Sequence, residues 1–405
     1  MPLRTKLIWL VVLYFAEGLP FGIVYDLLPV YFRSFDVSLA EIGMLSLLGM
    51  PWSLKVFWSP LIDRWGERRH WICFALLAMA ALLCSIPALS PRDPGVLMWT
   101  ILLAFTTLSA TQDVAIDAYT IGLIDKGEEG PANSVRVSAY RVALIFAGGA
   151  LVALATWMSW GSLFYIAAAV FVLLGFAALR TPPLPRLRSD AKQTWAPLWR
   201  WLRRPGGWAV LLFILLYKVG DAAMAPMIKP FWIDRGLTPA EIGLVSTTLG
   251  IAASILGAVV GGLWIRRHGI FAGLWALGLF QAVSNLGYAG VALSETGREW
   301  VYAASILESF CGGLGTAAFL SFLMNICDRE HAAVQYALLS AIFGLSRSIS
   351  GAFSGWGTEA LGYAPYFALT FLLAFPAYLF LPFFRTWIQE KGMDGSASAT
   401  PDSGP

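Results

Sequence analysis

Apolar runs of about 20 residues recur along the whole chain, and they constrain its fold more than any other feature. A helix needs about 20 apolar residues to cross the hydrocarbon core of a bilayer. Only 13% of the residues are charged, against about 25% in soluble proteins. The sequence therefore predicts an all-α polytopic membrane protein with about twelve transmembrane helices, at roughly 7–32, 41–62, 70–90, 96–124, 133–157, 161–180, 207–232, 240–265, 270–294, 299–326, 333–357 and 362–385.

The spacing of these runs divides the chain into two halves. Residues 1–180 and 207–387 each hold six of them, and residues 181–206 lie between. The linker is rich in Pro and basic residues, which is typical of a tether, and its aromatic second part is able to lie on a membrane surface. Residues 388–405 are small and polar, so we expect a disordered tail.

Basic residues predict the orientation. Lys and Arg favour the cytoplasmic loops of membrane proteins. With the N-terminus inside, the linker and the inner loops hold most of the basic residues, and the outer loops hold only Arg33, Arg92, Arg235 and Arg298. Both termini are therefore predicted to be cytoplasmic.

A short internal repeat supports the division into halves. "SLAEIG" (38–43) returns 200 residues later as "TPAEIG" (238–243). Ser38 and Thr238 have the position of N-caps, and Glu41 and Glu241 follow three residues on, which predicts a capping box at the start of the second helix of each half. Two six-helix halves joined by a basic loop resemble the layout of the major facilitator superfamily.

The loop "SPLIDRWGERR" (59–69) resembles a motif of that superfamily, G-x-L-x-D-R-x-G-R-R. The resemblance implies a charge lock between helices that opens during transport, carried by Asp63, Arg64, Arg68 and Arg69. Ser59 replaces the leading glycine. Ordinary positive-inside charge also explains Arg68 and Arg69, but it does not explain an acid. The matching stretch of the second half, "GGLWIRRHG" (261–269), has no acid, so the predicted lock is asymmetric.

Two aspartates lie inside an apolar run. Asp113 and Asp117 are one helical turn apart, so they share a helix face. Charges inside a membrane are costly and usually line a cavity. Desolvation and mutual repulsion both favour the protonated form, which predicts a proton-coupling role. The alternative is a structural ion pair with Arg136 or Arg141 on the next helix.

Further charges lie in other apolar runs. Lys218 and Asp221 share a helix face, where they are able to pair, and Asp221 is a second candidate for proton coupling. Glu17 precedes a helix break at Gly18–Leu19–Pro20 and is a third. Asp26 and Lys229 lie near predicted outer ends, so we expect both to reach toward the interface by snorkelling.

Polar residues on three other helices are candidates for a cavity wall. Arg347 has small residues along its face, and Gln281, Asn285 and Tyr288 form a polar stripe. Glu308 is followed on its face by Cys311, Gly312 and Gly315, which favour close helix packing.

Several function classes lack their motifs. No spacing of Cys or His indicates a metal site, and neither a phosphate-binding loop nor a nucleophile–base pair is present in the sequence. We therefore predict no cofactor, no metal and no enzymatic activity. The basic residues lie in short loops beside the apolar runs, so the net charge of +3 does not indicate nucleic-acid binding.

Several stretches, in order along the chain, resemble the AmpG-type anhydromuropeptide permeases and, more distantly, the acetyl-coenzyme A transporters. They include "EGLPFGI" (17–23), "TQDVAIDA" (111–118), "LYKVGDA" (216–222) and "QYALLSAIFGLSRSISG" (335–351). The resemblance implies a bacterial inner-membrane symporter that imports N-acetylglucosaminyl-anhydro-N-acetylmuramyl peptides for cell-wall recycling, driven by protons. Familiar members carry further membrane helices after the twelfth, and this chain stops at about twelve.

Such a solute carries carboxylates, sugar faces and N-acetyl groups. Arg141, Lys218 and Arg347 are candidate partners for carboxylates, and Gln281, Asn285, Tyr288 and Glu308 are candidate polar contacts. Two alternatives remain open at this point. The chain is a permease for another solute, such as acetyl-coenzyme A, a peptide or a drug, or it is a membrane sensor of cell-wall fragments that transports nothing.

Overall fold

The computed structural model is built of helices throughout the residues that it describes, which are 1–59, 62, 67–125, 127–184, 206–294, 297–327, 332–384 and 388. All twelve predicted runs are mainly helical over their described parts, with short turns inside some of them, such as 155–157 and 217–218. Ten helical segments in these ranges are long and apolar enough to cross a membrane. The other two runs are the second, which is broken into short pieces, and the fourth, which carries Asp113 and Asp117.

The N-terminal half contains the first six runs. Its elements are α1 (Leu3–Gly22), η1 (Ile23–Leu27) and α2 (Leu28–Arg33); α3 (Leu39–Met44), η2 (Leu45–Gly49), α4 (Met50–Leu54) and η3 (Lys55–Phe57); α6 (Arg68–Ser85) and η4 (Ile86–Ala88); α7 (Val96–Leu123); α8 (Glu129–Leu144), η5 (Ile145–Leu151) and α9 (Val152–Leu154); and α10 (Trp160–Leu179). The π-helical turns η1 and η5 lie mid-run, where such turns often mark functional positions.

The C-terminal half contains the other six. Its elements are α12 (Gly207–Leu216) and α13 (Val219–Asp234); α14 (Pro239–Glu241), η6 (Ile242–Leu249) and α15 (Gly250–His268); α16 (Ile270–Leu293); α17 (Arg298–Ile326); α18 (Ala332–Ala352) and α19 (Ser354–Leu361); and α20 (Tyr363–Leu373) and η7 (Phe375–Phe384). Pro226 and Pro230 lie inside α13. Membrane helices tolerate such breaks where neighbouring groups satisfy the freed backbone.

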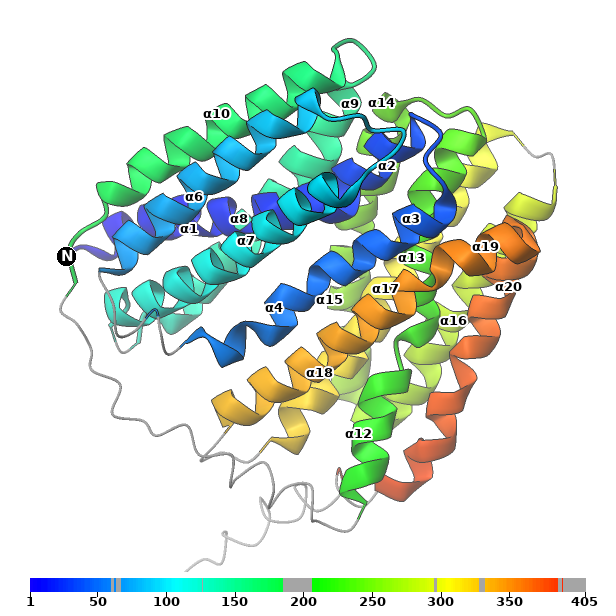
Figure 1. Cartoon of the computed structure of the whole chain (residues 1–405). Helices are drawn as coiled ribbons and strands as arrows, with labels where there is room; N and C mark the ends of the chain where they lie inside the picture. The colour runs from blue at the N-terminus through cyan, green and yellow to red at the C-terminus, as the bar shows by residue number, and fades with distance from the viewer. Residues whose placement is uncertain are drawn as a thin grey trace, which may run out of the picture.

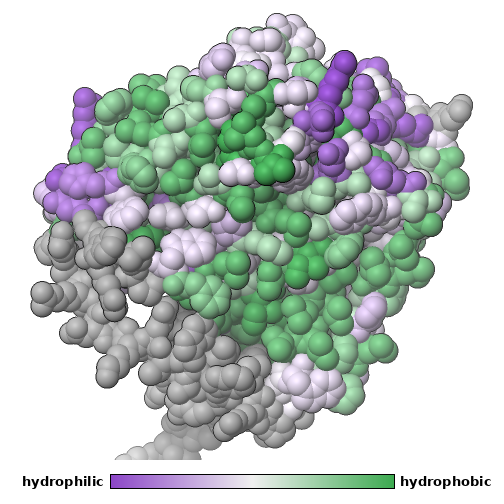
Figure 2. All heavy atoms as spheres, in the orientation of Figure 1, coloured by the Kyte–Doolittle hydropathy of each residue, from purple (hydrophilic) through white to green (hydrophobic). Residues whose placement is uncertain are grey.

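The outside of the molecule is apolar. Figure 2 shows a broad hydrophobic face, with hydrophilic side chains gathered toward the ends of the helices. Large apolar side chains on this outside include Leu173, which is 70% exposed, and Leu379, which is 72% exposed. A surface of this kind is suited to lipid rather than to water.

Both repeated sequences begin a helix with a side-chain cap, but the predicted capping box is complete only in the second copy. The Ser38 hydroxyl accepts a hydrogen bond from the Glu41 amide at 3.2 Å, and Thr238 accepts one from the Glu241 amide at 3.3 Å. In the second copy the Glu241 carboxylate also accepts from the Thr238 amide at 2.6 Å, which completes the reciprocal box. The two copies therefore open equivalent helices of the two halves.

The two halves meet closely at one end of the bundle, where α2, α3, α14 and α19 lie (Figure 1). We call it the Arg33 end. Arg33 Nε bonds Asp234 Oδ1 at 2.6 Å across the two halves, and Asp234 also accepts from Tyr363 at 2.6 Å. The Ala40 amide donates to Glu359 and the Ala240 amide donates to Thr156, each at 3.0 Å. Residues 200 apart thus make matching contacts with the opposite half.

Glycines allow the backbones to touch at this end. A Cβ added to Gly43 would lie 2.7 Å from the amide nitrogen of Gly355, and one added to Gly243 would collide with the carbonyl of Gly149. Each contact joins one half to the other. Small residues permit this close approach of membrane helices.

The opposite end, which we call the Lys6 end, is tied within the N-terminal half. Lys6 Nζ bonds Asp125 at 2.5 Å and Glu128 at 2.6 Å. These hydrogen bonds lower the pKa of both carboxyls. Figure 1 shows the two halves spread apart toward this end, and each has its own apolar packing there, with Phe213, Phe322 and Leu381 in the C-terminal half.

Candidate functional site

Three neighbouring cavities lie between the halves. The main cavity, of about 690 Å³, is lined by Lys55, Asp117, Arg136 and Arg347 among others. The floor cavity, of about 280 Å³, shares Arg347 with it and adds Asp26, Lys229 and Glu308. The side cavity, of about 330 Å³, shares Asp26 and Glu308 with the floor cavity and adds Lys218 and Asp221. Because they share these wall residues, the floor cavity adjoins both the main cavity and the side cavity.

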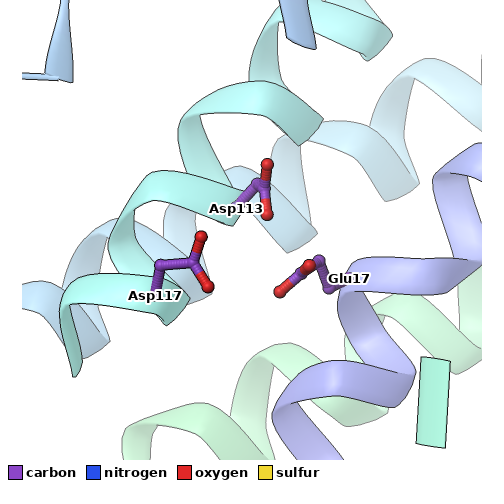
Figure 3. A group of neighbouring side chains, drawn as sticks. All are labelled: Glu17, Asp113 and Asp117. Atoms are coloured by element: carbon purple, nitrogen blue, oxygen red, sulfur yellow. The ribbon is translucent and has the colours of Figure 1, made fainter. Parts of the chain in front are cut away.

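Three carboxyl groups meet beside the main cavity. Glu17 comes from α1, and Asp113 and Asp117 come from successive turns of α7 (Figure 3). One oxygen of each lies within 4.8 Å of the others. The helical spacing predicted that Asp113 and Asp117 share a face, and the structure adds Glu17 opposite them. We call these three residues the acid cluster.

Two cations neutralise part of this cluster. Lys55 Nζ forms an ion pair with Asp113 and lies 4.0 Å from Asp117, and Arg136 Nη2 lies 3.1 Å from Asp117. Tyr14 also donates to Asp117 at 3.1 Å. The Asp117–Arg136 contact is the ion pair that the sequence left as an alternative.

Glu17 has a different environment. Its Oε2 is buried, and no group of the described residues forms a hydrogen bond with it. With all three carboxyls ionised, the acid cluster would carry three negative charges against two positive ones. A low-dielectric site disfavours such an imbalance, so binding of one proton stabilises the cluster. The three oxygens are also close enough to hold a cation, but Lys55 and Arg136 already supply two positive charges there.

A second polar cluster lies in the C-terminal half, beside the side cavity. Lys218 Nζ bonds Asp221 at 3.1 Å, Gln281 Oε1 at 2.6 Å and Thr316 at 3.2 Å. The predicted Lys218–Asp221 pair is therefore present. Gln281 and Thr316 come from α16 and α17, so the ammonium group joins three helices of this half.

Arg347 lies on the wall shared by the main and floor cavities. Its guanidinium carbon is 5.1 Å from the centre of the Phe21 ring and 4.6 Å from that of Tyr25, which is cation–π geometry. Phe21 also contacts Trp52, with ring centres 5.6 Å apart. The cavity-lining position predicted for Arg347 agrees with the structure, whereas the aromatic group around it was not predicted.

Asp26 and Lys229 do not snorkel, and that prediction is wrong. Lys229 Nζ forms an ion pair with Asp26, and the two side chains are only 11% and 21% exposed. Asp26 belongs to η1 and Lys229 to α13, so the pair connects the two halves. Because the partners are far apart in the sequence, each resembled an isolated charge near a helix end.

The predicted polar stripe on α16 divides into two parts. Gln281 binds Lys218, as described above. Asn285 donates to Thr370 at 3.2 Å, and Tyr288 accepts from Trp232 at 3.3 Å. Both Asn285 and Tyr288 are 0% exposed, so the structure places them among packed side chains, and neither is among the described residues that line the three cavities above. Glu308, in contrast, borders both the floor and side cavities.

Arg141 was predicted to bind the solute, but it is not among the described residues that line these three cavities. Arg136, on the same helix, lines the main cavity. Of the predicted gate, Asp63 and Arg64 lie outside the described residues. Arg69 Nε bonds Glu67 Oε2 at 2.6 Å at the start of α6, and Arg68 begins that helix.

Lys55 is the main site residue that had no predicted role. Its signal was present, since it is a cation inside the predicted apolar run 41–62. A buried cation requires an acid, and Asp113 is the acid that it pairs with. The choice of partner needed the packing of α7 against α4 and η3.

A helical bundle of this kind, with buried charges around cavities between two halves, is characteristic of membrane transporters. The chain matches the Major Facilitator Superfamily over residues 10–217. It is 33% identical to the "Anhydromuropeptide permease" of Escherichia coli (strain K12), over 92% of this chain and 78% of that one. It is 28% identical to "Putative transporter AmpG 4" of Rickettsia conorii, over 94% of this chain and 97% of that one.

Solved structures agree on the fold. A bacterial homologue of the human lysosomal transporter Spinster, inward-facing and unoccupied, has a TM-score of 0.75 at 16% identity, over 96% of this chain and 98% of that one. The nucleoside transporter NupG has a TM-score of 0.72 at 16% identity, over 96% of this chain and 99% of that one. The chain belongs to the Major Facilitator Superfamily, in its AmpG-type branch.

Proposed function

We propose that the chain is a proton-coupled permease that imports anhydromuropeptides across the bacterial inner membrane by alternating access. The observation that carries the proposal is the acid cluster, in which three carboxyls face two cations beside a cavity of about 690 Å³. The permease of Escherichia coli named above supplies the solute class.

The proton part of the proposal rests on charge balance. Asp113 and Asp117 each contact a cation, and Glu17 contributes the third carboxyl. One proton bound by the acid cluster removes the excess negative charge. Asp221 lies in the other half beside Lys218 and is a secondary candidate for coupling. Protonation of the acid cluster weakens the attraction between its carboxylates and Lys55. Because Lys55 also lines the main cavity, the proton affects the cavity wall.

The solute part rests on the cavity lining. Arg347 and Lys55 are suited to carboxylates, and the rings of Phe21, Tyr25 and Trp52 are suited to the apolar faces of sugars. These side chains line one cavity. An anhydromuropeptide offers both kinds of group in one molecule.

The orientation of the molecule in the membrane rests on the positive-inside rule. The basic residues of the predicted inner loops favour a periplasmic Arg33 end, and a cytoplasmic Lys6 end with both termini in the cytoplasm. The closed contacts at the Arg33 end then correspond to a state that faces the cytoplasm. Asp63, Arg64, Arg68 and Arg69 are the candidates for the lock that closes the other end.

Uptake into proteoliposomes tests the function. We expect labelled N-acetylglucosaminyl-anhydro-N-acetylmuramyl tripeptide to accumulate when the outside is acidic, and acetyl-coenzyme A to compete poorly. Asp113→Asn keeps the shape of the side chain but removes its charge and its proton. This variant should lose accumulation and keep downhill exchange of solute. If it still concentrates the solute in response to the gradient, the acid cluster is structural, and if the wild type binds without moving solute, the protein is a sensor.

A further inference from the structure

The Asp26–Lys229 ion pair has no role in the proposed proton site, yet it is built into the cavity floor. Lys229 is 8% exposed and lines the floor cavity together with Asp26. The pair is also a direct connection between the two halves, since η1 and α13 belong to different halves. It lies where the floor and side cavities adjoin, because Asp26 borders both.

Asp26 is seated by the backbone around it. It lies in the π-helical turn η1, and Gly148 of the π-helical turn η5 packs against it. A Cβ at position 148 would collide with the Asp26 side chain. The glycine therefore leaves the space that the Asp26 side chain occupies when it pairs with Lys229.

Lys229 needs an anion. A buried ammonium group is costly without a partner, and Asp26 is the carboxylate that supplies one here. Among the described residues, the floor cavity is also lined by the ionisable side chains of Tyr25, Glu308 and Arg347. A carboxylate that enters from the cavity offers Lys229 the same chemical group as Asp26, and Arg347 on the same wall adds attraction for an anion.

We propose that Lys229 is a carboxylate-binding residue of the solute site, and that Asp26 is its internal counter-ion, which takes the place of the solute carboxylate when the site is empty. The inference rests on the proposed function for the identity of the solute. Binding of the solute carboxylate releases Asp26 and breaks an ion pair between the halves. Return of Asp26 to Lys229 displaces the carboxylate, which favours release of the solute when the halves are closed at the Arg33 end.

The test removes Asp26 and supplies a free carboxylate. In purified Asp26→Ala, acetate should occupy the vacated position and raise the thermal unfolding midpoint with a saturable dose response. Acetamide has the same shape without the charge and should be weaker by about tenfold or more. The double variant Asp26→Ala/Lys229→Met should respond equally to both. Equal responses to acetate and acetamide in Asp26→Ala itself would overturn the proposal.

Asp234→Ala is the matched control, since it also removes a carboxylate from an ion pair between the halves. Its partner Arg33 keeps contact with water, with a side chain 21% exposed, so acetate gains little there. If acetate stabilises this variant as strongly as Asp26→Ala, the effect reflects a loosened contact between halves and the proposal fails.

Asp26→Asn provides a second measurement, which still tests the proposal if the alanine variant folds poorly. The dissociation constant of N-acetylglucosaminyl-anhydro-N-acetylmuramate should fall by about tenfold, and that of its carboxamide should not change. Equal changes for both probes overturn the role of Lys229. If acetate stabilises Asp26→Ala but neither sugar probe binds Asp26→Asn, Lys229 is still a carboxylate-binding residue. The muropeptide is then not the solute, and the proposed function fails.

Discussion

The two halves of the molecule use one scaffold for two kinds of polar cluster. Ser38 and Thr238 cap equivalent helices, and Ala40 and Ala240 make matching contacts with the opposite half. The acid cluster of the N-terminal half has more acids than cations. In the C-terminal half, Lys218 is bonded to one acid and to two neutral groups.

This difference separates two tasks. Neutral partners satisfy a buried ammonium group at any proton concentration, whereas a cluster with excess acid responds to protons. The two halves share the helix caps and the contacts with the opposite half, which position the helices. They differ in their buried ionisable groups. We infer that the acid cluster of the N-terminal half is the main proton site, with Asp221 as the secondary candidate, and that Lys218 contributes a fixed positive charge to the solute site.

The largest expected effect comes from the same substitution made in each half. Glu17→Gln removes the third carboxyl of the acid cluster, so accumulation of labelled muropeptide under an imposed pH gradient should fall to the level of empty vesicles while exchange continues. Glu308→Gln changes the wall of the floor and side cavities. It should keep accumulation and raise the half-saturating solute concentration by a few-fold.

Accumulation and exchange are measured in the same vesicles, with and without the gradient. Loss of accumulation in Glu308→Gln with full accumulation in Glu17→Gln would reverse the assignment of the two halves. Loss in both variants would mean that protons are carried by both clusters.

The sequence was sufficient to predict the helices and the existence of buried charges. Periodicity placed Asp113 and Asp117 on one face, and local capping rules placed Ser38 and Thr238 at helix starts, because these relations involve neighbouring residues on one helix. The closed Arg33 end was not predicted. Its contacts, such as Arg33–Asp234, depend on how two distant helices pack.

Partner choice was the other part that the sequence did not supply. A buried charge indicates that a partner exists, but any opposite charge in the membrane satisfies that requirement. Lys229 illustrates the problem, since its partner Asp26 lies in the other half. The same holds for Asn285 and Tyr288, whose polar atoms bind neighbouring helices inside the C-terminal half.

An intermediate effect is expected from the paired glycines at the Arg33 end. Gly43→Ala and Gly243→Ala each insert a methyl group against the backbone of the opposite half. Overpacking of this kind costs about 1–3 kcal/mol. Both variants should widen the distance between spin labels at Trp157 and Leu361, which are exposed residues of different halves. Gly262→Ala has nothing within 4 Å of the added atom, so it should leave the distance unchanged.

The outcome tests whether the repeat is functional at both copies. If only Gly243→Ala opens the Arg33 end, the contact between η5 and η6 holds the halves together and the contact between α3 and α19 adapts. A shift in the Gly262→Ala control would mean that the labels report helix flexibility instead of separation of the halves.

The smallest expected effect separates the two capping sequences. Glu241 accepts hydrogen bonds from the Thr238 amide at 2.6 Å and the Thr238 hydroxyl at 2.8 Å, and it pairs with Arg298 at 3.0 Å. Glu41 accepts from the Ser38 hydroxyl at 2.9 Å. Glu241→Ala should therefore lower the free energy of unfolding by about 1–2 kcal/mol, and Glu41→Ala by about 0.5 kcal/mol or less. Thermal unfolding in detergent, followed by tryptophan fluorescence, compares the two variants directly. A Glu41→Ala midpoint equal to or below that of Glu241→Ala would show that the first copy is supported as strongly as the second. The halves would then differ in their buried charges alone.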